Sequence, residues 1–252
     1  MRMRINRYLA RAGVASRRKS EELIREGRVF CNGKPVETLS TMIEPGDRVV
    51  VDGKDIQPPK QTSTYLYHKP RGSLCSHFDP HGGRLIYEDL PDEPGLFSIG
   101  RLDRDSEGLL LVTNDGAFSQ QIAHPSANTE KEYLVVLDRA LDEKDRLRAL
   151  RGIHDGKEVY HPDRIWIFHQ REASDHQIPD WPPDREGASI LHIVLHEGRK
   201  REIRRLFHRL GYEVIRLIRV RIGSLRLGTL APGEWIPLNS DEKKEVLNDQ
   251  NL

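Results

Sequence analysis

A carboxylate flanked by guanidinium groups occupies one short segment of this sequence, and these residue types can do chemistry. The segment GRLDRDSEG places Asp103 between Arg101 and Arg104. A nearby guanidinium lowers the pKa of a carboxyl group and keeps it ionised. An ionised aspartate can then act as a nucleophile or as a base. From composition alone, a structural ion pair in a loop is the commoner interpretation of such residues.

The segment EGRKREIRRLFHRLG combines two helical patterns. Apolar residues recur at helical spacing in Ile203, Leu206, Phe207 and Leu210. An adjacent face repeats that spacing with Arg201, Arg204, Arg205 and His208. Gly211 ends the pattern. We therefore predict a helix that packs inward and presents a cationic row to RNA, the alternative being a merely solvated cationic surface.

Three further segments are expected to meet near these residues. VIRLIRVRIG alternates apolar with basic residues and predicts a half-buried strand. TEKEYLVVL predicts another strand, in which Tyr133 either stacks on an unpaired base or belongs to the core. Lys69-Pro70-Arg71-Gly72 follows the strand-like run YLYH, and its turn is expected to bring Lys69 and Arg71 to the same site.

The elements around Asp103 must hold it in place. The apolar run LFSI precedes its loop, and the run GLLLVT after it is typical of a buried strand. Asn114-Asp115-Gly116 predicts a turn at the end of that strand. Asp103 is therefore expected in a loop between two strands.

The N-terminal segment combines two short helical patterns with basic residues. The first runs from Ile5 to a stop at Gly13, and Ser16 is expected to cap the second. Cations in a first helical turn oppose the helix dipole, so the second helix start predicts a phosphate site, unless neighbouring glutamates neutralise it. Two hairpin turns are predicted, at Asn32-Gly33 and Asp52-Gly53. The residues assigned here to RNA contact are Arg4, Arg7, Arg17, Arg18, Lys19 and Arg28.

Charge is unevenly distributed along the 252 residues. Residues 1–60 carry a net charge of +5 and residues 196–226 carry +7, whereas the remainder carries −11. Two basic regions on an acidic body favour a polyanionic partner gripped at two places. No apolar run reaches the roughly 18 residues of a membrane span, and no export signal is evident. The two cysteines, Cys31 and Cys75, cannot build a disulfide framework and do not have the spacing of metal ligands. A protein of the reducing cytoplasm is therefore expected.

A break in the pattern divides the chain. QPPKQTST shows two prolines and no apolar period, so residues 57–64 are predicted to be a linker. The predicted domains are residues 1–56 and residues 65–252, and a polar, Pro-rich loop is predicted over residues 170–187. The sequence contains no phosphate-binding loop, dinucleotide fingerprint or metal-ligand cluster, so no cofactor or metal is expected.

The segment RINRYLARAGVASRRKSEELIREGRVFCNGK resembles the alpha-L RNA-binding domain, known from a ribosomal small-subunit protein and from many RNA-modifying enzymes. The segments KPRG, GRLDRDSEGLLLVTNDG, KEYLV and EGRKREIRRLF with LIRVRIG resemble the RsuA/RluB/RluE/RluF family of ribosomal RNA pseudouridine synthases, in the same order and spacing. The segments EGRKREIRRLF and LIRVRIG are most similar to the branch of this family that acts on large-subunit rRNA. Around Asp79, Gly82 and Arg84, a segment expected to contact RNA departs from the family pattern.

The resemblance implies a fold, a reaction and residue roles. The fold is α+β, with a small helical and β RNA-binding domain and a mixed, mainly antiparallel sheet flanked by helices, the catalytic cleft lying across the sheet. Asp103 matches the catalytic aspartate, Tyr133 the active-site tyrosine and Arg204 the basic partner of the aspartate. The residues Lys69, Arg71, Arg101, Arg201 and Arg205 are also expected to contact RNA. A flipped-out uridine would be isomerised through attack at ribose C1′, attack at uracil C6 or formation of a glycal.

Two other functions fit the same residues. An RNA chaperone or ribosome-assembly factor would use the basic surfaces without chemistry. A glycoside hydrolase would pair Asp103 with Asp105 or Glu107 across a sugar. The intervening Arg104 and the predicted N-terminal RNA-binding domain disfavour this function. The expected partner is ribosomal RNA, free or in an assembly particle, and the enzyme is expected to be a cytoplasmic monomer without a membrane segment.

Overall fold

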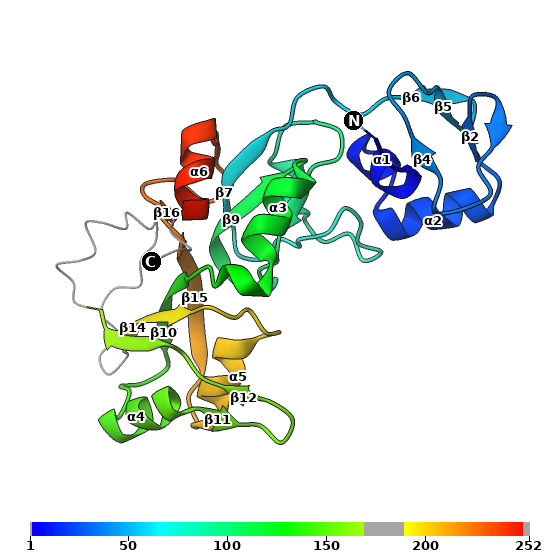
Figure 1. Ribbon diagram of the computed structural model, residues 1–252. Helices are drawn as coiled ribbons and strands as arrows, with labels where there is room; N and C mark the ends of the chain where they lie inside the picture. The colour runs from blue at the N-terminus through cyan, green and yellow to red at the C-terminus, as the bar shows by residue number, and fades with distance from the viewer. Residues whose placement is uncertain (1, 169–188, 249–252) are drawn as a thin grey trace. The chain divides into compact units, whose positions relative to one another are not determined.

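The computed structural model describes residues 2–168 and 189–248 (Figure 1). The chain forms two compact units, which are described separately. One comprises the described part of Met1–Thr64 with Pro91–Phe97 and Val112–Gly116, and the other comprises Tyr65–Leu90, Ser98–Leu111 and the described part of Ala117–Leu252. The domain limits and the 57–64 linker stay predictions. The loop predicted over residues 170–187 lies outside the described residues.

The first unit contains the two predicted helices and a small sheet. Its helices are α1 (Ile5–Arg11) and α2 (Arg17–Arg25). The strands are β1 (Met3–Arg4), β2 (Val29–Cys31), β3 (Lys34–Pro35), β4 (Met42–Ile43), β5 (Val49–Val51) and β6 (Lys54–Ile56). Strands β3-β2-β5-β6 form one antiparallel sheet, and β1 pairs with β4.

Local chemistry explains these elements. The Ser16 side chain accepts a hydrogen bond from the Lys19 backbone N–H, which confirms the predicted cap of α2. Asn32 and Gly33 both have positive φ (50° and 78°), as the predicted tight turn between β2 and β3 requires. Apolar residues of both helices pack on the sheet around Leu9 and Val29.

The second unit is organised around a nine-stranded mixed sheet in the order β13-β14-β10-β15-β9-β7-β17, with β16 on β15 and β8 on β9. Its strands are β7 (Thr64–Lys69), β8 (Phe97–Ile99), β9 (Glu107–Thr113), β10 (Lys131–Leu137), β13 (Arg164–Ile167), β14 (Ile190–Leu195), β15 (Val214–Ile222), β16 (Leu225–Arg226) and β17 (Trp235–Pro237). The β9–β15 pair is parallel, whereas the pairs of β10 with β14 and β15 are antiparallel. The α+β, mainly antiparallel prediction is confirmed.

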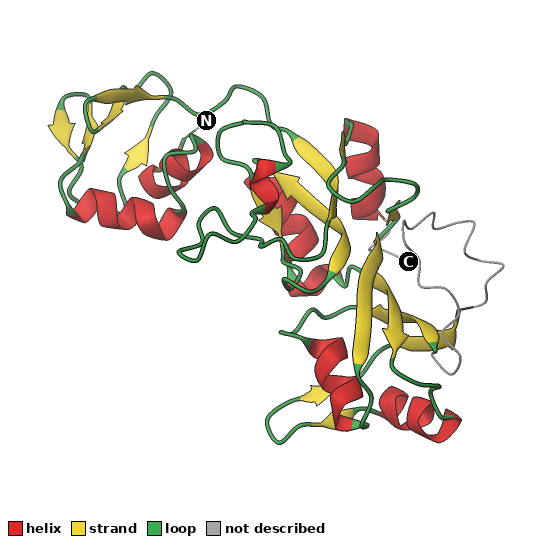
Figure 2. Ribbon diagram, turned by 180° about the vertical axis from the view of Figure 1, so that it is seen from behind, coloured by secondary structure: helices red, strands yellow, loops and turns green. Residues whose placement is uncertain are grey.

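Helices cover both faces of this sheet (Figures 1 and 2). They are α3 (Gly116–Ala123), α4 (Glu143–Arg151), α5 (Glu202–Arg209) and α6 (Ser240–Asn248), with short 3₁₀ turns at Ile86–Glu88 and Pro125–Ala127 and a separate hairpin of β11 (Ile153–His154) and β12 (Val159–Tyr160). Alternate residues of β10 point to opposite faces. Tyr133 and Val135 join the apolar cluster that contains α4 and α5, and Leu134 joins the cluster of α3 and α6.

Strand β15 differs from the half-buried strand predicted for it. Arg219 is buried and its Nε donates to the Leu109 carbonyl (2.7 Å), because helices and neighbouring strands enclose both faces here. None of the helices in the described part of the chain is long and apolar enough to cross a membrane.

Candidate active site

The loop that carries Asp103 is held by its main chain. It connects β8 and β9, and the Ser106 N–H donates to the Asp103 carbonyl (3.0 Å). The Lys69 ammonium donates to the Ser106 carbonyl (2.7 Å) and to that of Arg104 (3.4 Å). The Gly72 N–H also donates to the Arg104 carbonyl (2.7 Å). The segment from Lys69 to Gly72 therefore holds the loop without using the Asp103 carboxylate.

Lys69 was predicted to contact RNA, and the structure contradicts this. Its side chain is 0 % exposed, and its ammonium also donates to the Pro70 carbonyl (3.1 Å). Burial lowers the pKa of Lys69 to about 8. A buried ammonium must find acceptors within the fold, and these carbonyls supply them. Arg71, two residues later, is exposed.

Arg201 is the arginine that pairs with Asp103. The Asp103 side chain is 32 % exposed, and its Oδ2 lies 3.9 Å from Nη1 of Arg201. Arg201 directly precedes α5 and was predicted from the sequence to contact RNA. The carboxylate therefore has a cation beside it and a partly open approach.

Arg204 was predicted to pair directly with Asp103, and this prediction is corrected. Its Nη1 donates to the Val214 carbonyl (2.8 Å) and its Nη2 to the Asp105 carbonyl (3.0 Å). Burial, followed by repulsion from Arg201, lowers the pKa of Arg204, while the nearby carboxylates of Asp105 and Asp103 oppose this. A half-buried guanidinium needs fixed acceptors, and the main chain supplies them. Arg204 thus ties the Asp103 loop to the start of β15.

Tyr133 lies on the same face of the sheet as this loop. It is 7 % exposed and belongs to the apolar cluster that includes Leu102, the residue before Asp103, and Ile203 of α5. Its hydroxyl makes no hydrogen bond within the described residues. The packing therefore brings the predicted tyrosine, the aspartate loop and the cationic helix to one side of the sheet.

A close approach of main chains sets the spacing between β9 and β15. Gly108 of β9 pairs with Arg219 of β15, and a Cβ at Gly108 would lie 2.3 Å from the Arg219 carbonyl oxygen. Arg219 in turn pairs with Tyr133 on β10, next to a register shift. Only glycine permits this approach, so the position of the Asp103 loop relative to Tyr133 depends on Gly108.

The β11–β12 hairpin supports α5. Nη1 of Arg205 donates to the Tyr160 hydroxyl (2.8 Å). The same atom lies 3.8 Å from Oε2 of Glu158 and 4.0 Å from Oδ2 of Asp155. The Tyr160 hydroxyl is the largest of several hydrogen-bond donors that lower the pKa of Asp155. Arg205 was predicted to contact RNA, but the structure engages its guanidinium within the protein because the hairpin carries acceptors opposite it.

Comparison with known proteins assigns the chain to a family. Residues 63–209 match the model of the RNA pseudouridylate synthase family, and residues 3–49 match the S4 domain model. The chain belongs to the RNA pseudouridylate synthase family. Both resemblances drawn from the sequence are thereby confirmed.

Several relatives are similar over almost the full length. An Aquifex aeolicus RNA pseudouridine synthase is 38% identical over 100% of this chain and 96% of its own. The ribosomal large subunit pseudouridine synthase B of Bacillus subtilis is 34% identical over 96% of this chain and 95% of its own. A crystal structure of a pseudouridylate synthase aligns with a TM-score of 0.65 at 27% identity, covering 97% of this chain and 99% of that one.

The S4 region of this synthase displays most of the cations assigned to RNA contact. Among the cations assigned to RNA contact, those that are exposed and form no ion pair within the described residues are Arg4, Arg7, Arg17, Arg18, Lys19, Arg71 and Arg101. Glu21, a suggested local neutraliser, instead accepts a hydrogen bond from Asn6 (3.1 Å). Arg28 differs from the prediction: it pairs with Asp52 (2.6 Å) and Glu26 (2.9 Å), because the hairpin turn at Asp52 lies opposite it.

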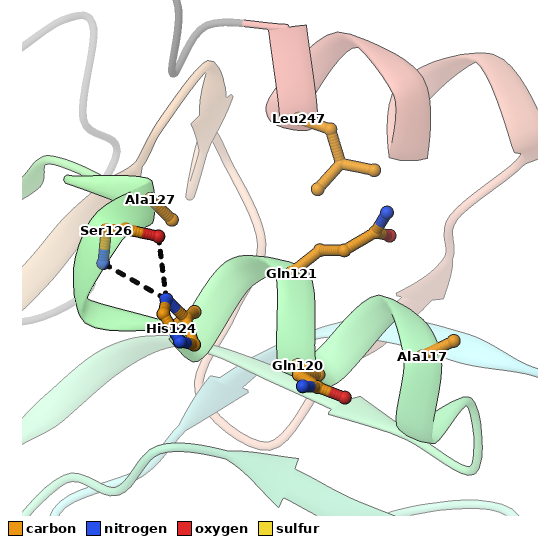
Figure 3. Close-up of a pocket in the computed structure, with 7 residues that line it drawn as sticks. All are labelled: Ala117, Gln120, Gln121, His124, Ser126, Ala127 and Leu247. Atoms are coloured by element: carbon orange, nitrogen blue, oxygen red, sulfur yellow. Dashed lines mark hydrogen bonds between the residues drawn. The ribbon is translucent and has the colours of Figure 1, made fainter.

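A cavity of about 570 Å³ lies elsewhere in the synthase (Figure 3). Its lining comes from α3, the turn after it and α6, and consists of Ala117, Gln120, Gln121, His124, Ser126, Ala127 and Leu247. None of these is a predicted site residue. In the part of the chain that the structure describes, no group of three or more His, Cys, Asp or Glu residues could hold a metal ion.

Proposed function

We propose that this synthase isomerises a uridine of large-subunit ribosomal RNA to pseudouridine, with Asp103 as the catalytic residue. The observation that carries the proposal is the Asp103 carboxylate, one-third exposed beside Arg201 on a loop whose carbonyls are held by Lys69, Gly72 and Arg204. The loop presents a carboxylate to an incoming nucleoside in a fixed place. Fixed placement of a reacting group is a large part of enzymatic rate enhancement.

The reaction balances within one nucleotide. The bond between N1 of uracil and C1′ of ribose breaks, a bond between C5 and C1′ forms, C5 loses a proton and N1 gains one. The base must first leave its stack, which costs a few kcal/mol. The cations of the S4 region and the ring of Tyr133 would offset this cost. Attack at C1′, attack at C6 and glycal formation all begin from the ionised Asp103.

The two arginines take different roles in this proposal. Arg201, with its Nη1 3.9 Å from Oδ2 of Asp103, stabilises negative charge that develops near this carboxylate during the reaction. Arg204 acts as a positioning residue through its bonds to Asp105 and Val214. Glu107 is unavailable as a second catalytic carboxylate, since it is buried in a two-point ion pair with Arg216 (2.6 and 3.0 Å). This removes Glu107 from the glycoside hydrolase alternative, which leaves only Asp105 to pair with Asp103.

The assignment to the large subunit rests on relatives. The Bacillus subtilis and Vibrio cholerae relatives named as ribosomal large subunit pseudouridine synthase B are 34% and 36% identical to this chain. The substrate would be rRNA, free or in an assembly particle. We expect the enzyme to act as a monomer in the cytoplasm, which agrees with two free cysteines.

The test compares Asp103→Asn with Asp105→Asn, a matched loss of a neighbouring carboxylate. Pseudouridines are mapped in total rRNA from cells that carry each variant as their only copy. We expect one large-subunit pseudouridine to disappear with Asp103→Asn and to persist with Asp105→Asn, while purified Asp103→Asn still binds unmodified large-subunit rRNA. An unchanged pseudouridine map would refute the proposal, and a biological effect that survives Asp103→Asn would favour the RNA chaperone.

A further inference from the structure

Phe78 is the most exposed large hydrophobic side chain of the described residues, with 75 % of its surface open to solvent. We propose that Phe78 is a base-stacking residue that takes an unpaired base next to the target uridine and so contributes to the choice of target. This proposal rests on the proposed function, because it assumes an RNA substrate at the Asp103 loop. Nothing in the sequence patterns singled Phe78 out.

The loop that carries Phe78 is ordered by its own contacts. The Leu74 N–H donates to the Arg84 carbonyl (2.9 Å), and the Ile86 N–H donates to the Leu74 carbonyl (3.1 Å), so the two ends of the loop are joined. The Ser76 hydroxyl donates to the Phe78 carbonyl (2.7 Å). A loop held in this way fixes the backbone that carries the aromatic ring, which reduces the entropy lost on binding.

Two residues expected to contact RNA instead build this loop. Asp79 accepts a hydrogen bond from the Gly83 N–H (2.7 Å). Arg84 forms an ion pair with Asp89 (2.6 Å). Their side chains are thus engaged within the protein, whereas Phe78, directly before Asp79 in the sequence, is exposed.

The loop also runs beside the Asp103 loop. The Gly72 N–H donates to the Arg104 carbonyl (2.7 Å), and the Cys75 thiol lies 3.5 Å from the Leu102 carbonyl. Three residues of extended chain span at most about 11 Å. The backbone of Phe78 therefore lies within that distance of Cys75, close enough for its ring to meet a nucleotide flanking one held at Asp103.

The chemistry favours a base over another occupant. Single exposed apolar residues are common and mean little alone. Here Arg71, seven residues before Phe78 in the same segment of the chain, is exposed and makes no ion pair within the described residues. An exposed aromatic ring and an unpaired cation on one segment match a base and a phosphate of the same RNA strand, and unpaired bases in RNA loops are commonly held on aromatic side chains.

The first experiment measures affinity for unmodified large-subunit rRNA transcript over a range of salt concentrations. Replacing a stacking residue by alanine costs about 1–3 kcal/mol per base, so we expect Phe78→Ala to raise Kd roughly 5- to 150-fold and KM more than kcat. The slope of log K against log salt should stay as in the wild type, because no cation is lost, whereas Arg71→Ala should reduce it by about 0.7–0.9. Leu147→Ala, at an exposed apolar site on α4, is the control and should change neither quantity.

The second experiment keeps the proposal separate from catalysis. Phe78→Trp and Leu147→Trp are each made in the Asp103→Asn background and titrated with the same transcript. After subtraction of the signal of Asp103→Asn, which contains the three native tryptophans, stacking should quench the added fluorescence of Phe78→Trp and leave that of Leu147→Trp unchanged, whether or not the protein makes pseudouridine. A Kd of Phe78→Ala equal to that of the wild type, or quenching equal at both sites, would overturn the proposal and point to a protein partner for this loop.

Discussion

Replacing Lys69 by methionine tests how the Asp103 loop is positioned. The ammonium donates to three carbonyls, but two of these have another donor: Arg104 accepts from the Gly72 N–H (2.7 Å) and Pro70 from the Ser73 hydroxyl (2.9 Å). The Ser106 carbonyl would lose the bond that it accepts from Lys69 (2.7 Å). Methionine keeps nearly the same length and volume. The variant therefore removes one anchor of the loop without opening a cavity.

Two opposing effects set the expected change in stability. A buried carbonyl left without a donor costs about 1–3 kcal/mol. Burial lowers the pKa of Lys69 from 10.5 to about 8, which corresponds to about 3 kcal/mol of unfavourable charge burial at neutral pH. Because methionine leaves the Ser106 carbonyl without this donor but also removes the buried charge, the two effects oppose each other, and we expect the free energy of unfolding to change by less than about 2 kcal/mol. The loop, in contrast, loses the anchor nearest Asp103, and misplacement by about 1 Å can cost about 100-fold in rate.

The assay pairs urea unfolding with single-turnover formation of pseudouridine. Lys131→Met is the control, because Lys131 is partly buried, has a pKa lowered to about 8 by burial and donates to two carbonyls (2.9 and 2.8 Å). Within the described residues, Lys131 makes no hydrogen bond to the Asp103 loop, so the rate loss of Lys131→Met should be much smaller. A rate for Lys69→Met within about threefold of that for Lys131→Met would refute the reasoning.

The same pair of proteins gives a pH test. Between about pH 7.5 and about pH 9.5 native Lys69 loses its proton while the unfolded chain keeps it, so the unfolded state binds more protons and stability rises with pH. The free energy of unfolding of the wild type, measured relative to Lys69→Met, should therefore increase by about 2 kcal/mol over this interval. A decrease would mean that the pKa of Lys69 is not lowered in the fold.

Three other perturbations follow from the geometry. Arg204→Ala should lower the single-turnover rate roughly 10- to 100-fold, and Arg204→Lys should not restore it, since an ammonium cannot reach the carbonyls of both Val214 and Asp105. A rate equal to that of the wild type would contradict the role of Arg204 in joining the Asp103 loop to β15. Gly108→Ala should lower the melting temperature by the equivalent of about 1–3 kcal/mol, because its Cβ meets the Arg219 carbonyl at 2.3 Å, whereas Gly116→Ala, with open space around it, should change little. Neutralising the three cations at the start of α2, Arg17, Arg18 and Lys19, should weaken RNA binding and reduce the slope of log K against log salt by about 2–3. An unchanged slope would contradict the predicted phosphate site.

Much of the local structure could be predicted because its causes lie within a few residues. The Ser16 cap, the Asn32-Gly33 turn and the helix that ends before Gly211 depend on backbone preferences and short-range hydrogen bonds. The run after Asp103 is apolar at consecutive positions, so both faces of the strand are apolar and the run predicts a buried strand. The polar residues before this strand then predict the loop that carries Asp103. These patterns placed Asp103 between two strands before any tertiary contact was known.

The partners of the charged side chains depended on packing between distant segments. Arg201 and Arg204 are three residues apart on one cationic row, and only the fold shows that the first pairs with Asp103 while the second bonds to the carbonyl of Asp105, 99 residues away in sequence. Lys69 has the composition of an RNA contact but is buried, because its strand lies inside the sheet.

By itself, the sequence determined the family, the order of the elements and the residue that is the best candidate for chemistry, since these follow from local patterns and motif order. The tertiary structure decided which cation faces that residue, which cations stay exposed and that Phe78 projects into solvent. The physical reason is that burial and pairing are set by which surfaces meet when strands and helices pack, and neighbours in sequence carry little information about those meetings.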